Sequence, residues 1–258
     1  MSKKVILAFS GGLDTSFCVP YLIDQGYEVH TLFVNTGGIS AKEELAITKR
    51  ANELGAKKHI NLNVEKSLWS EILIPLVQSG ALYQNKYPAL CSDRYLIVKE
   101  SIKLCKKLNT NNIAHGCTGM GNDQIRFDLS IRAHGKYNII TPIREIQNIT
   151  KNVRAYEEDY LRDKGFKVSS LNKKYSINEN LMGATISGSE IDEWKEPSSE
   201  SFVLCKLPHQ YPKKSKTLKI KFLKGKVISI NDKKMQGADF LKILNLSLIH
   251  ISEPTRLS

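Results

Sequence analysis

The stretch Ala8-Phe9-Ser10-Gly11-Gly12-Leu13-Asp14-Thr15-Ser16 lies between a short apolar run and a helical pattern. It is typical of a turn from a buried parallel strand, Val5–Phe9, into a helix from about Thr15 to Gln25. Gly11 and Gly12 tolerate positive φ, so successive backbone N–H groups can curl into a nest for an anion. The start of the helix adds free donors and a positive dipole. We therefore predict a phosphate-binding loop.

The polar side chains of this loop strengthen that prediction. Ser10, Thr15 and Ser16 offer hydroxyl groups, and Asp14 can cap the helix or reach a phosphate-bound Mg²⁺. The loop lacks the lysine of G-x-x-x-x-G-K-[ST] and the spacing of G-x-G-x-x-G. A plain tight turn would need only the two glycines and a cap, so the added hydroxyls and acid favour a phosphate site.

Strand and helix patterns alternate along the first two-thirds of the chain. This alternation indicates βαβ units and a doubly wound parallel sheet, in which ligands bind beyond the carboxyl ends of the strands. Besides the first strand, we predict strands at Val29–Val34, Ile60–Val64, Ile113–His115 and Tyr137–Thr141. Besides the first helix, we predict helices at Ser40–Gly55, Ser92–Leu108 and Val153–Lys164, and a helical stretch that follows the third strand and continues through Val77.

The texture of the sequence changes near Val168. Polar, turn-rich sequence follows, with a loop predicted at 196–200 and a hairpin of 218–223 and 227–230 around Gly225. We predict an α/β domain over residues 1–168, followed by part of a second, α+β domain over residues 169–245.

Composition narrows the class of protein. The net charge is +12, and the lysines are densest between residues 213 and 234. Lys, Asn and Ile all have A/T-rich codons, so genome composition explains this excess as well as RNA binding does, and no RNA-recognition motif accompanies the charge. Five cysteines without C-x-x-C spacing argue against a disulfide framework or a zinc ribbon. No apolar run reaches the roughly 18–20 residues of a membrane span, and no secretory signal is evident. We expect a cytoplasmic protein with neither nucleic-acid nor membrane partners.

A second glycine-rich segment, His115–Phe127, reads His-Gly-Cys-Thr-Gly-Met-Gly-Asn-Asp-Gln-Ile-Arg-Phe. Its three glycines let a backbone lie close against a ligand. Asn122, Asp123 and Arg126 follow at the start of a helix, where an acid and an amide can orient an amine and the guanidinium can hold a carboxylate bidentately. For the glycines alone a plain turn remains open, and a lone His115 is more often structural.

The loop Ser-Gly-Gly-Leu-Asp-Thr-Ser after a first strand resembles the pyrophosphate loop of the ATP pyrophosphatases, the PP-loop group with an adenine nucleotide alpha hydrolase-like fold. With Ala-Phe before it, it resembles the argininosuccinate synthase family. The segment His115–Phe127 closely resembles that family's H-G-x-T-G-x-G-N-D-Q-x-R-F, and Tyr175–Met182 resembles its W-S-x-D-E-N-L. The resemblance runs from about Lys3 to Asn245. Departures at Met120, at Thr185 and around Ser92 indicate a divergent branch.

The resemblance implies roles for individual residues. Catalytic roles fall on Asp14, Asp123 and Arg126. Contacts to ATP fall on Ala8, Phe9, Ser10, Gly11, Gly12, Leu13, Asp14, Thr15, Ser16, Val34, His115, Gly116, Gly119 and Gly121. Contacts to citrulline fall on Tyr87, Ser92, Asn122, Arg126, Ser176 and Thr185, and contacts to aspartate on Thr118, Asn122 and Asp123.

The reaction that the resemblance implies joins citrulline to aspartate, in arginine biosynthesis and the urea cycle. The citrulline ureido oxygen attacks the α-phosphate of ATP, pyrophosphate leaves, and the aspartate amine displaces AMP. This C–N ligase uses ATP and Mg²⁺, has no protein metal centre of its own, and is a homotetramer at full length. Two alternatives stay open: a tRNA-modifying ATP pyrophosphatase of the thiolation type, and a non-catalytic ATP-binding domain.

The last residues do not fit the family. The stretch from Leu246 to Arg256 matches none of its segments and looks like the translation of a transposon-based sequencing adapter. We expect residues 246–258 to be a non-native tail on a family sequence that breaks off near Asn245, although an ordinary frayed terminus is the simpler alternative.

Overall fold

The computed structural model describes residues 3–82, 85–86, 90–168, 174–193, 195–211, 213, 217–235 and 237–248. The chain divides into two compact units. The first comprises Met1–Asn35, Ile39–Asn63 and Ser92–Leu171, and the second comprises Thr36–Gly38, Val64–Cys91 and Asn172–Ser258. The proposed domain boundary near residue 168 stays a prediction.

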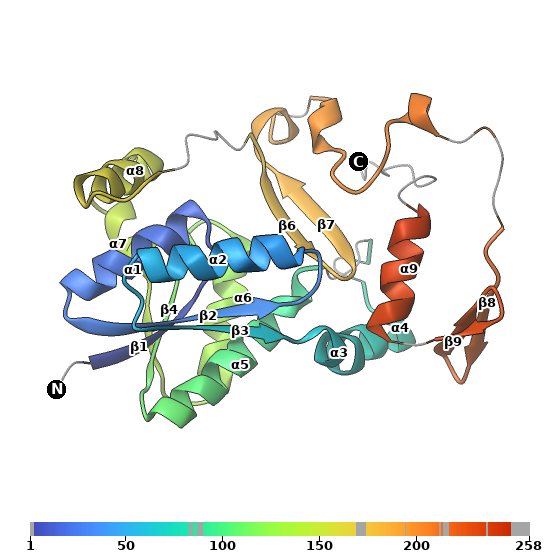
Figure 1. Cartoon of the computed structure of the whole chain (residues 1–258), viewed down its shortest axis with the longest axis horizontal. Helices are drawn as coiled ribbons and strands as arrows, with labels where there is room; N and C mark the ends of the chain where they lie inside the picture. The colour runs from blue at the N-terminus through green and yellow to red at the C-terminus, as the bar shows by residue number, and fades with distance from the viewer. Residues whose placement is uncertain are drawn as a thin grey trace. The chain divides into compact units, whose positions relative to one another are not determined.

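The first unit is built on a parallel sheet of five strands in the order β3-β2-β1-β4-β5. The helices α1, α2 and α8 lie on one face of this sheet and α5 lies on the other (Figure 1). The predicted doubly wound α/β fold is confirmed. The strands are β1 (Lys3–Ala8), β2 (Tyr27–Asn35), β3 (Lys58–Asn63), β4 (Asn112–His115) and β5 (Asn138–Ile140), and the helices are α1 (Leu13–Asp24), α2 (Ala41–Glu53), α5 (Asp93–Leu108), α6 (Asn122–Ala133), α7 (Pro142–Gln147) and α8 (Val153–Asp163).

The order of the strands determines where a ligand can bind. The chain leaves β1 toward β2 on one side and later returns to β4 on the other, so the order reverses between β1 and β4. Ala8, the last residue of β1, pairs with His115, the last residue of β4. Both predicted loops therefore start side by side at the carboxyl edge of the sheet, where α/β proteins bind ligands.

Local sequence signals account for the helix boundaries. Ser40 and Glu43 form the predicted capping box at the start of α2: the Ser40 hydroxyl accepts from Glu43 N at 3.3 Å, and Ser40 N donates to Glu43 Oε2 at 2.7 Å. Gly26, Gly55 and Gly165 follow α1, α2 and α8 with φ of 82°, 89° and 79°, a conformation that costs glycine little.

The core of the first unit joins β1 to the helices on one face. Val5 and Leu7 have no exposed surface and pack with Phe17 of α1. The Phe17 ring also contacts Tyr160 of α8, with ring centroids 5.0 Å apart. The apolar run of β1 is thus covered as a central parallel strand requires.

The second unit contains two small antiparallel sheets. The predicted hairpin is confirmed as β8 (Ile220–Leu223) and β9 (Lys226–Ile230), and β10 (Lys233–Lys234) extends it. Lys224 and Gly225 form its turn with φ of 49° and 71°, as a type I′ turn demands. A second hairpin pairs β6 (Ser176–Asn180) with β7 (Gly183–Ser187); its mostly polar strands lack the alternation that would have predicted it.

Helices complete the second unit. The predicted helical stretch through Val77 consists of α3 (Glu65–Ser67), the π-helical η1 (Leu68–Leu73) and α4 (Ile74–Ser79). The helix α9 (Ala238–Leu248) packs Phe240 against Val227 and Ile230 of β9. From residue 249 on, the predicted tail lies outside the described residues. Short 3₁₀ turns are η2 (Leu90–Ser92), η3 (Ser189–Ile191), η4 (Ser199–Ser201) and η5 (Pro208–Gln210).

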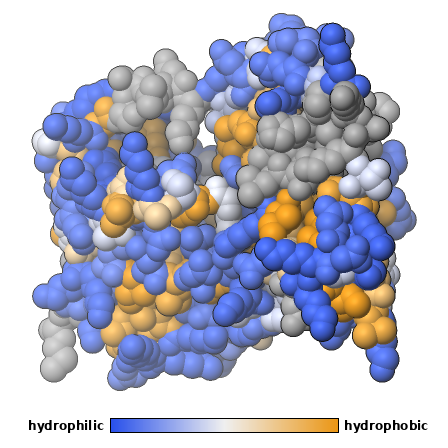
Figure 2. Space-filling view, turned by 45° about the vertical axis from the view of Figure 1, so that its right-hand side comes forward, coloured by the Kyte–Doolittle hydropathy of each residue, from blue (hydrophilic) through white to orange (hydrophobic). Residues whose placement is uncertain are grey.

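The surface is mainly hydrophilic on the face drawn in Figure 2, with smaller apolar areas between the polar residues. None of the helices described here is both long enough and apolar enough to pass through a bilayer.

The capping box of α2 gives a stability prediction. Replacing Ser40 with Ala leaves the first-turn N–H groups without their side-chain acceptor, so the free energy of unfolding should fall by about 1 kcal/mol. Urea denaturation followed by circular dichroism measures this. Lys42→Ala, in the same first turn, is the control and should change it by less than about 0.5 kcal/mol; an equal loss in both variants would contradict the capping role.

Candidate functional site

The first loop joins the end of β1 to the start of α1. Gly11 has φ of 76°, and a Cβ there would lie 3.1 Å from Ile47 Cγ1. Gly12 is the N-cap of α1 with φ of −71° and ψ of 176°. The expectation of positive φ thus holds for Gly11 only, because Gly12 takes the extended conformation that an N-cap requires. No side chain caps α1.

The hydroxyl groups of the loop hold one another. Ser10 Oγ lies 3.2 Å from Thr15 Oγ1, and Gly12 N donates to Ser10 Oγ at 3.4 Å. Ser16 is buried, and its Oγ accepts from Arg50 Nε of α2 at 3.3 Å. The loop is therefore shaped by its own hydroxyls, with one cation behind the helix start.

Asp14 forms an acid pair with Glu157 of α8. Asp14 lies in the first turn of α1 rather than at the N-cap, and its carboxyl group interacts electrostatically with that of Glu157. Glu157 is only 1% exposed, and its Oε1 has no partner among the described residues. Burial, and then the charge of Asp14, raise the pKa of Glu157 to about 9. Glu157 therefore carries a proton at neutral pH.

Glu157 was not predicted from the sequence. The one available signal was its position four residues before the buried Leu161, which places it on the covered side of α8.

The second loop contacts the first at Gly116. A Cβ at Gly116 would lie 3.1 Å from Thr15 Cγ2 and 3.3 Å from Thr15 N, so a larger residue would push the two loops apart. Thr118, Gly119 and Gly121 continue the loop to Asn122, the first residue of α6. The structure thus brings the two predicted glycine-rich loops together.

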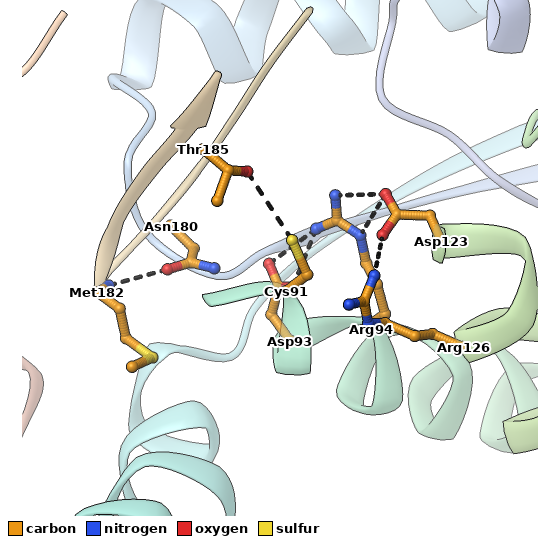
Figure 3. A network of polar contacts seen from close by, with 8 residues as sticks. All are labelled: Cys91, Asp93, Arg94, Asp123, Arg126, Asn180, Met182 and Thr185. Carbon is orange, nitrogen blue, oxygen red and sulfur yellow. Dashed lines mark hydrogen bonds and ion pairs between the residues drawn. The ribbon is translucent and has the colours of Figure 1, made fainter. Parts of the chain in front are cut away.

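Asp123 is held between two arginines (Figure 3). Arg94 Nη2 lies 3.0 Å from Asp123 Oδ2, and Arg126 Nη1 lies 3.1 Å from Asp123 Oδ1. Arg94 also pairs with the buried Asp93, with Nη1 2.9 Å from Oδ1. Opposite charges therefore alternate along a chain of four side chains, in which Arg94 was not predicted from the sequence.

The remaining predicted residues are spread over the two units. Val34 on β2 and Ser92 at the start of α5 are buried in the first unit. Ser176 on β6 and Thr185 on β7 belong to the second unit, and Tyr87 lies outside the described residues. The predicted substrate contacts of these residues stay predictions.

The hairpin that carries Ser176 and Thr185 packs on the segment Thr36–Gly38. Leu181 N donates to Thr36 O at 3.0 Å, and a Cβ at Gly38 would lie 2.8 Å from Glu179 Cγ. In the same unit Thr185 Oγ1 lies 3.8 Å from Cys91 Sγ, and Asn180 Oδ1 accepts from Met182 N at 2.9 Å (Figure 3).

Among the residues that the structure describes, no group of three or more His, Cys, Asp or Glu side chains is placed to hold a metal ion.

Two family profiles match the chain. The one described as "Arginosuccinate synthase N-terminal HUP domain" matches residues 4–166, and "Arginosuccinate synthase C-terminal domain" matches residues 175–248. The chain is 49% identical over 244 residues to an argininosuccinate synthase of Xanthomonas campestris, covering 95% of this chain and 62% of that protein. It is 37% identical to one of Hyperthermus butylicus, covering 94% and 61%. The chain therefore spans about 60% of the length of these relatives.

A solved structure of NH3-dependent NAD synthetase from Campylobacter jejuni aligns with a TM-score of 0.39 and 14% identity, covering 63% of this chain and 65% of that chain. A likeness this remote carries no information on function.

The two glycines of the first loop should respond differently to substitution. Gly11→Ala forces a side chain into positive φ and against Ile47, which should cost about 1–2 kcal/mol of stability. Gly12→Ala meets neither obstacle and should leave the melting temperature unchanged. Gly12→Asp should also fold but should lose affinity for pyrophosphate at least tenfold, since it adds a negative charge at the anion site. Thermal melts and calorimetric titration measure these effects; unchanged pyrophosphate affinity in Gly12→Asp would contradict an anion site here.

The buried acid pair predicts a pH dependence of stability. The folded pKa of Glu157 is about 9 against an ordinary 4.5, so folding retains a proton that the unfolded chain loses. This contribution to stability is complete below pH 4.5 and declines as the pH rises to 9. Glu157→Gln removes the titration and should be more stable than the wild type by at least about 1 kcal/mol at pH 8, with a smaller difference at pH 5. Urea unfolding at both pH values tests this, with Asp159→Asn, at an exposed acid of the same helix, as the control.

Proposed function

Because this chain belongs to the argininosuccinate synthase family, we propose that it binds ATP at residues 8–16 and uses it to join citrulline to aspartate. In this reaction the citrulline ureido oxygen attacks the α-phosphate, pyrophosphate leaves with its bonding electrons, and the aspartate amine then displaces AMP. The products are argininosuccinate, AMP and pyrophosphate. The chain spans about 60% of its relatives, so the complete reaction is part of the proposal. A cytoplasmic location and a homotetramer rest on the family alone.

Electrostatic stabilisation of the departing pyrophosphate is the task we assign to the first loop. The positive φ of Gly11 and the start of α1 at Gly12 would direct backbone amides and the positive end of the helix dipole toward the proposed pyrophosphate. Mg²⁺, when bound with the nucleotide, would neutralise the charge that develops on the phosphates. The hydroxyl oxygens of Ser10 and Thr15 suit this hard cation as ligands, with phosphate oxygens supplying the remainder.

The second loop would hold the two amino acids. Asp123 and Arg126 form an ion pair, with Arg126 Nη1 3.1 Å from Asp123 Oδ1. Their opposite charges are complementary to the ammonium and carboxylate groups of amino acids. We assign the aspartate amine to Asp123 and a citrulline carboxylate to Arg126, so that substrate binding exchanges one ion pair for two. Arg94, 3.0 Å from Asp123 Oδ2, would hold the Asp123 carboxylate in place during this exchange. The Asp123–Arg126 pair, which follows the loop whose Gly116 packs against Thr15, is the observation that carries the proposal.

The thiol of Cys117, in the second loop, is poorly suited to covalent catalysis. Burial is the main cause that raises the pKa of Cys117 to about 12, so its thiol stays protonated at neutral pH and is a poor nucleophile. A thiolation-type enzyme needs a reactive cysteine, which weighs against that alternative. Holding reactants in line can supply much of the rate acceleration.

Ligand binding to this chain tests the assignment of Arg126. Arg126→Lys loses the bidentate fork and should lower citrulline affinity at least tenfold, with ATP affinity unchanged, because lysine holds a carboxylate only as a point charge. Calorimetric titration of citrulline in the presence of a non-hydrolysable ATP analogue measures this. Arg132→Lys on the exposed side of the same helix is the matched control and should change neither affinity.

Two outcomes would contradict the proposed function. Failure of the wild type to bind ATP, citrulline and aspartate under these conditions would remove its basis. Tight, steeply salt-dependent binding of tRNA would instead support the tRNA-modifying alternative. Release of AMP only when both amino acids are present would exclude a non-catalytic nucleotide-binding domain.

A further inference from the structure

The second loop is supported from behind by His115, the last residue of β4. This side chain is 1% exposed. Its Nε2 lies 3.0 Å from Asp128 Oδ1 on α6, and its Nδ1 lies 3.3 Å from the backbone N of Cys117 in the loop. The Phe127 ring packs against the imidazole, with centroids 5.1 Å apart. Both ring nitrogens are thus engaged by the protein.

The partners of His115 determine its tautomer. Because the Cys117 amide can only donate, Nδ1 must be the acceptor, and the ring hydrogen lies on Nε2 and is donated to Asp128. The ring is therefore neutral. Burial lowers the pKa of His115, which opposes the effect of the nearby Asp128 and keeps this neutral form.

Asp128 is fixed from its other side by α7. Arg144 Nη1 lies 2.9 Å from Asp128 Oδ2, and Arg144 Nη2 lies 3.1 Å from Oδ1. This bidentate pair leaves Asp128 little freedom to rotate away from His115. The chain Cys117 N–H, His115, Asp128 and Arg144 thereby links the loop to β4, α6 and α7.

Gly119, at the tip of the same loop, is held by a separate pair of side chains. Gly119 N donates to Gln147 Oε1 of α7 at 2.8 Å, and Gln124 Nε2 donates to Gly119 O at 2.7 Å. A loop of glycines has high conformational entropy when unrestrained. Both polar backbone groups of its tip are here fixed by side chains from the following helices.

We propose that His115, Asp128, Arg144 and Gln147 are positioning residues that hold the second glycine loop, residues 116–121, in the conformation that receives the substrates. What the loop receives rests on the proposed function; how it is held does not. The proposal assigns the His115 ring to the support of the loop rather than to a direct contact with ATP. Preorganisation of this kind spares the ligand the cost of ordering the loop.

The thiol of Cys117 reports loop order without reference to any ligand. It is half-buried in the loop, and Cys205 in the second unit provides an internal reference of similar exposure. The rate of N-ethylmaleimide labelling at each cysteine is measured by peptide mass spectrometry, and ATP affinity by calorimetry on the same samples. The ratio of the Cys117 rate to the Cys205 rate is the readout of the loop.

Three variants and one control test the support. His115→Leu removes both hydrogen bonds and should raise the labelling ratio at least fivefold and weaken ATP binding at least tenfold. His115→Asn should recover part of both effects, because an asparagine oxygen can accept the amide hydrogen two residues on. Gln147→Leu, a half-exposed change that should not impair folding, should raise the labelling ratio on its own. His134→Asn should change neither readout, because the native His134 lies at the exposed end of α6, where its Nδ1 is 2.8 Å from Ser130 O.

Each outcome bears on the proposal. An unchanged labelling ratio in both His115→Leu and Gln147→Leu would show that these side chains do not hold the loop. A raised ratio with wild-type ATP affinity would show that the loop they hold does not position the nucleotide. If the wild type binds no ATP, the proposed function fails, while the labelling ratio still decides whether the loop is held.

Discussion

The parallel pairing of β1 with β4 is the constraint on which the site depends. Ala8 lies opposite His115, so two loops that are about 100 residues apart in sequence begin at neighbouring strand ends. Gly116 then packs against the first turn of α1 so closely that a Cβ would lie 3.1 Å from Thr15 Cγ2. Any displacement of either strand would separate the glycines of the first loop from the Asp123 and Arg126 side chains that follow the second.

Charge is balanced in different ways around the two loops. Behind the first loop, Glu157 is too buried to ionise beside Asp14, and the pair retains a proton. At the second loop, Asp123 and Asp93 are each paired with Arg94. The first arrangement limits negative charge behind the first loop, while the second places opposite charges side by side at the start of α6.

Much of the fold and of the loops followed from local pattern. The apolar run of β1, the capping box of Ser40 and the Gly225 turn depend on neighbouring residues, so their elements could be predicted within a few residues. The β6–β7 hairpin could not, because its strands are mostly polar and one side packs on Gly37 and Gly38, far away in sequence. Arg94 and Glu157 were missed for the same reason, since Asp123 and Asp14, with which they interact, come from other helices.

The sequence by itself determined the alternation of strands and helices, the two glycine-rich loops and the family, because each is written in contiguous residues. Only the tertiary structure decided that Gly11 rather than Gly12 takes positive φ, that Glu157 lies against Asp14, and that His115 supports a loop through Asp128 and Arg144. These features depend on burial and on hydrogen-bond partners from separate elements. Such partners become neighbours only when the chain has folded.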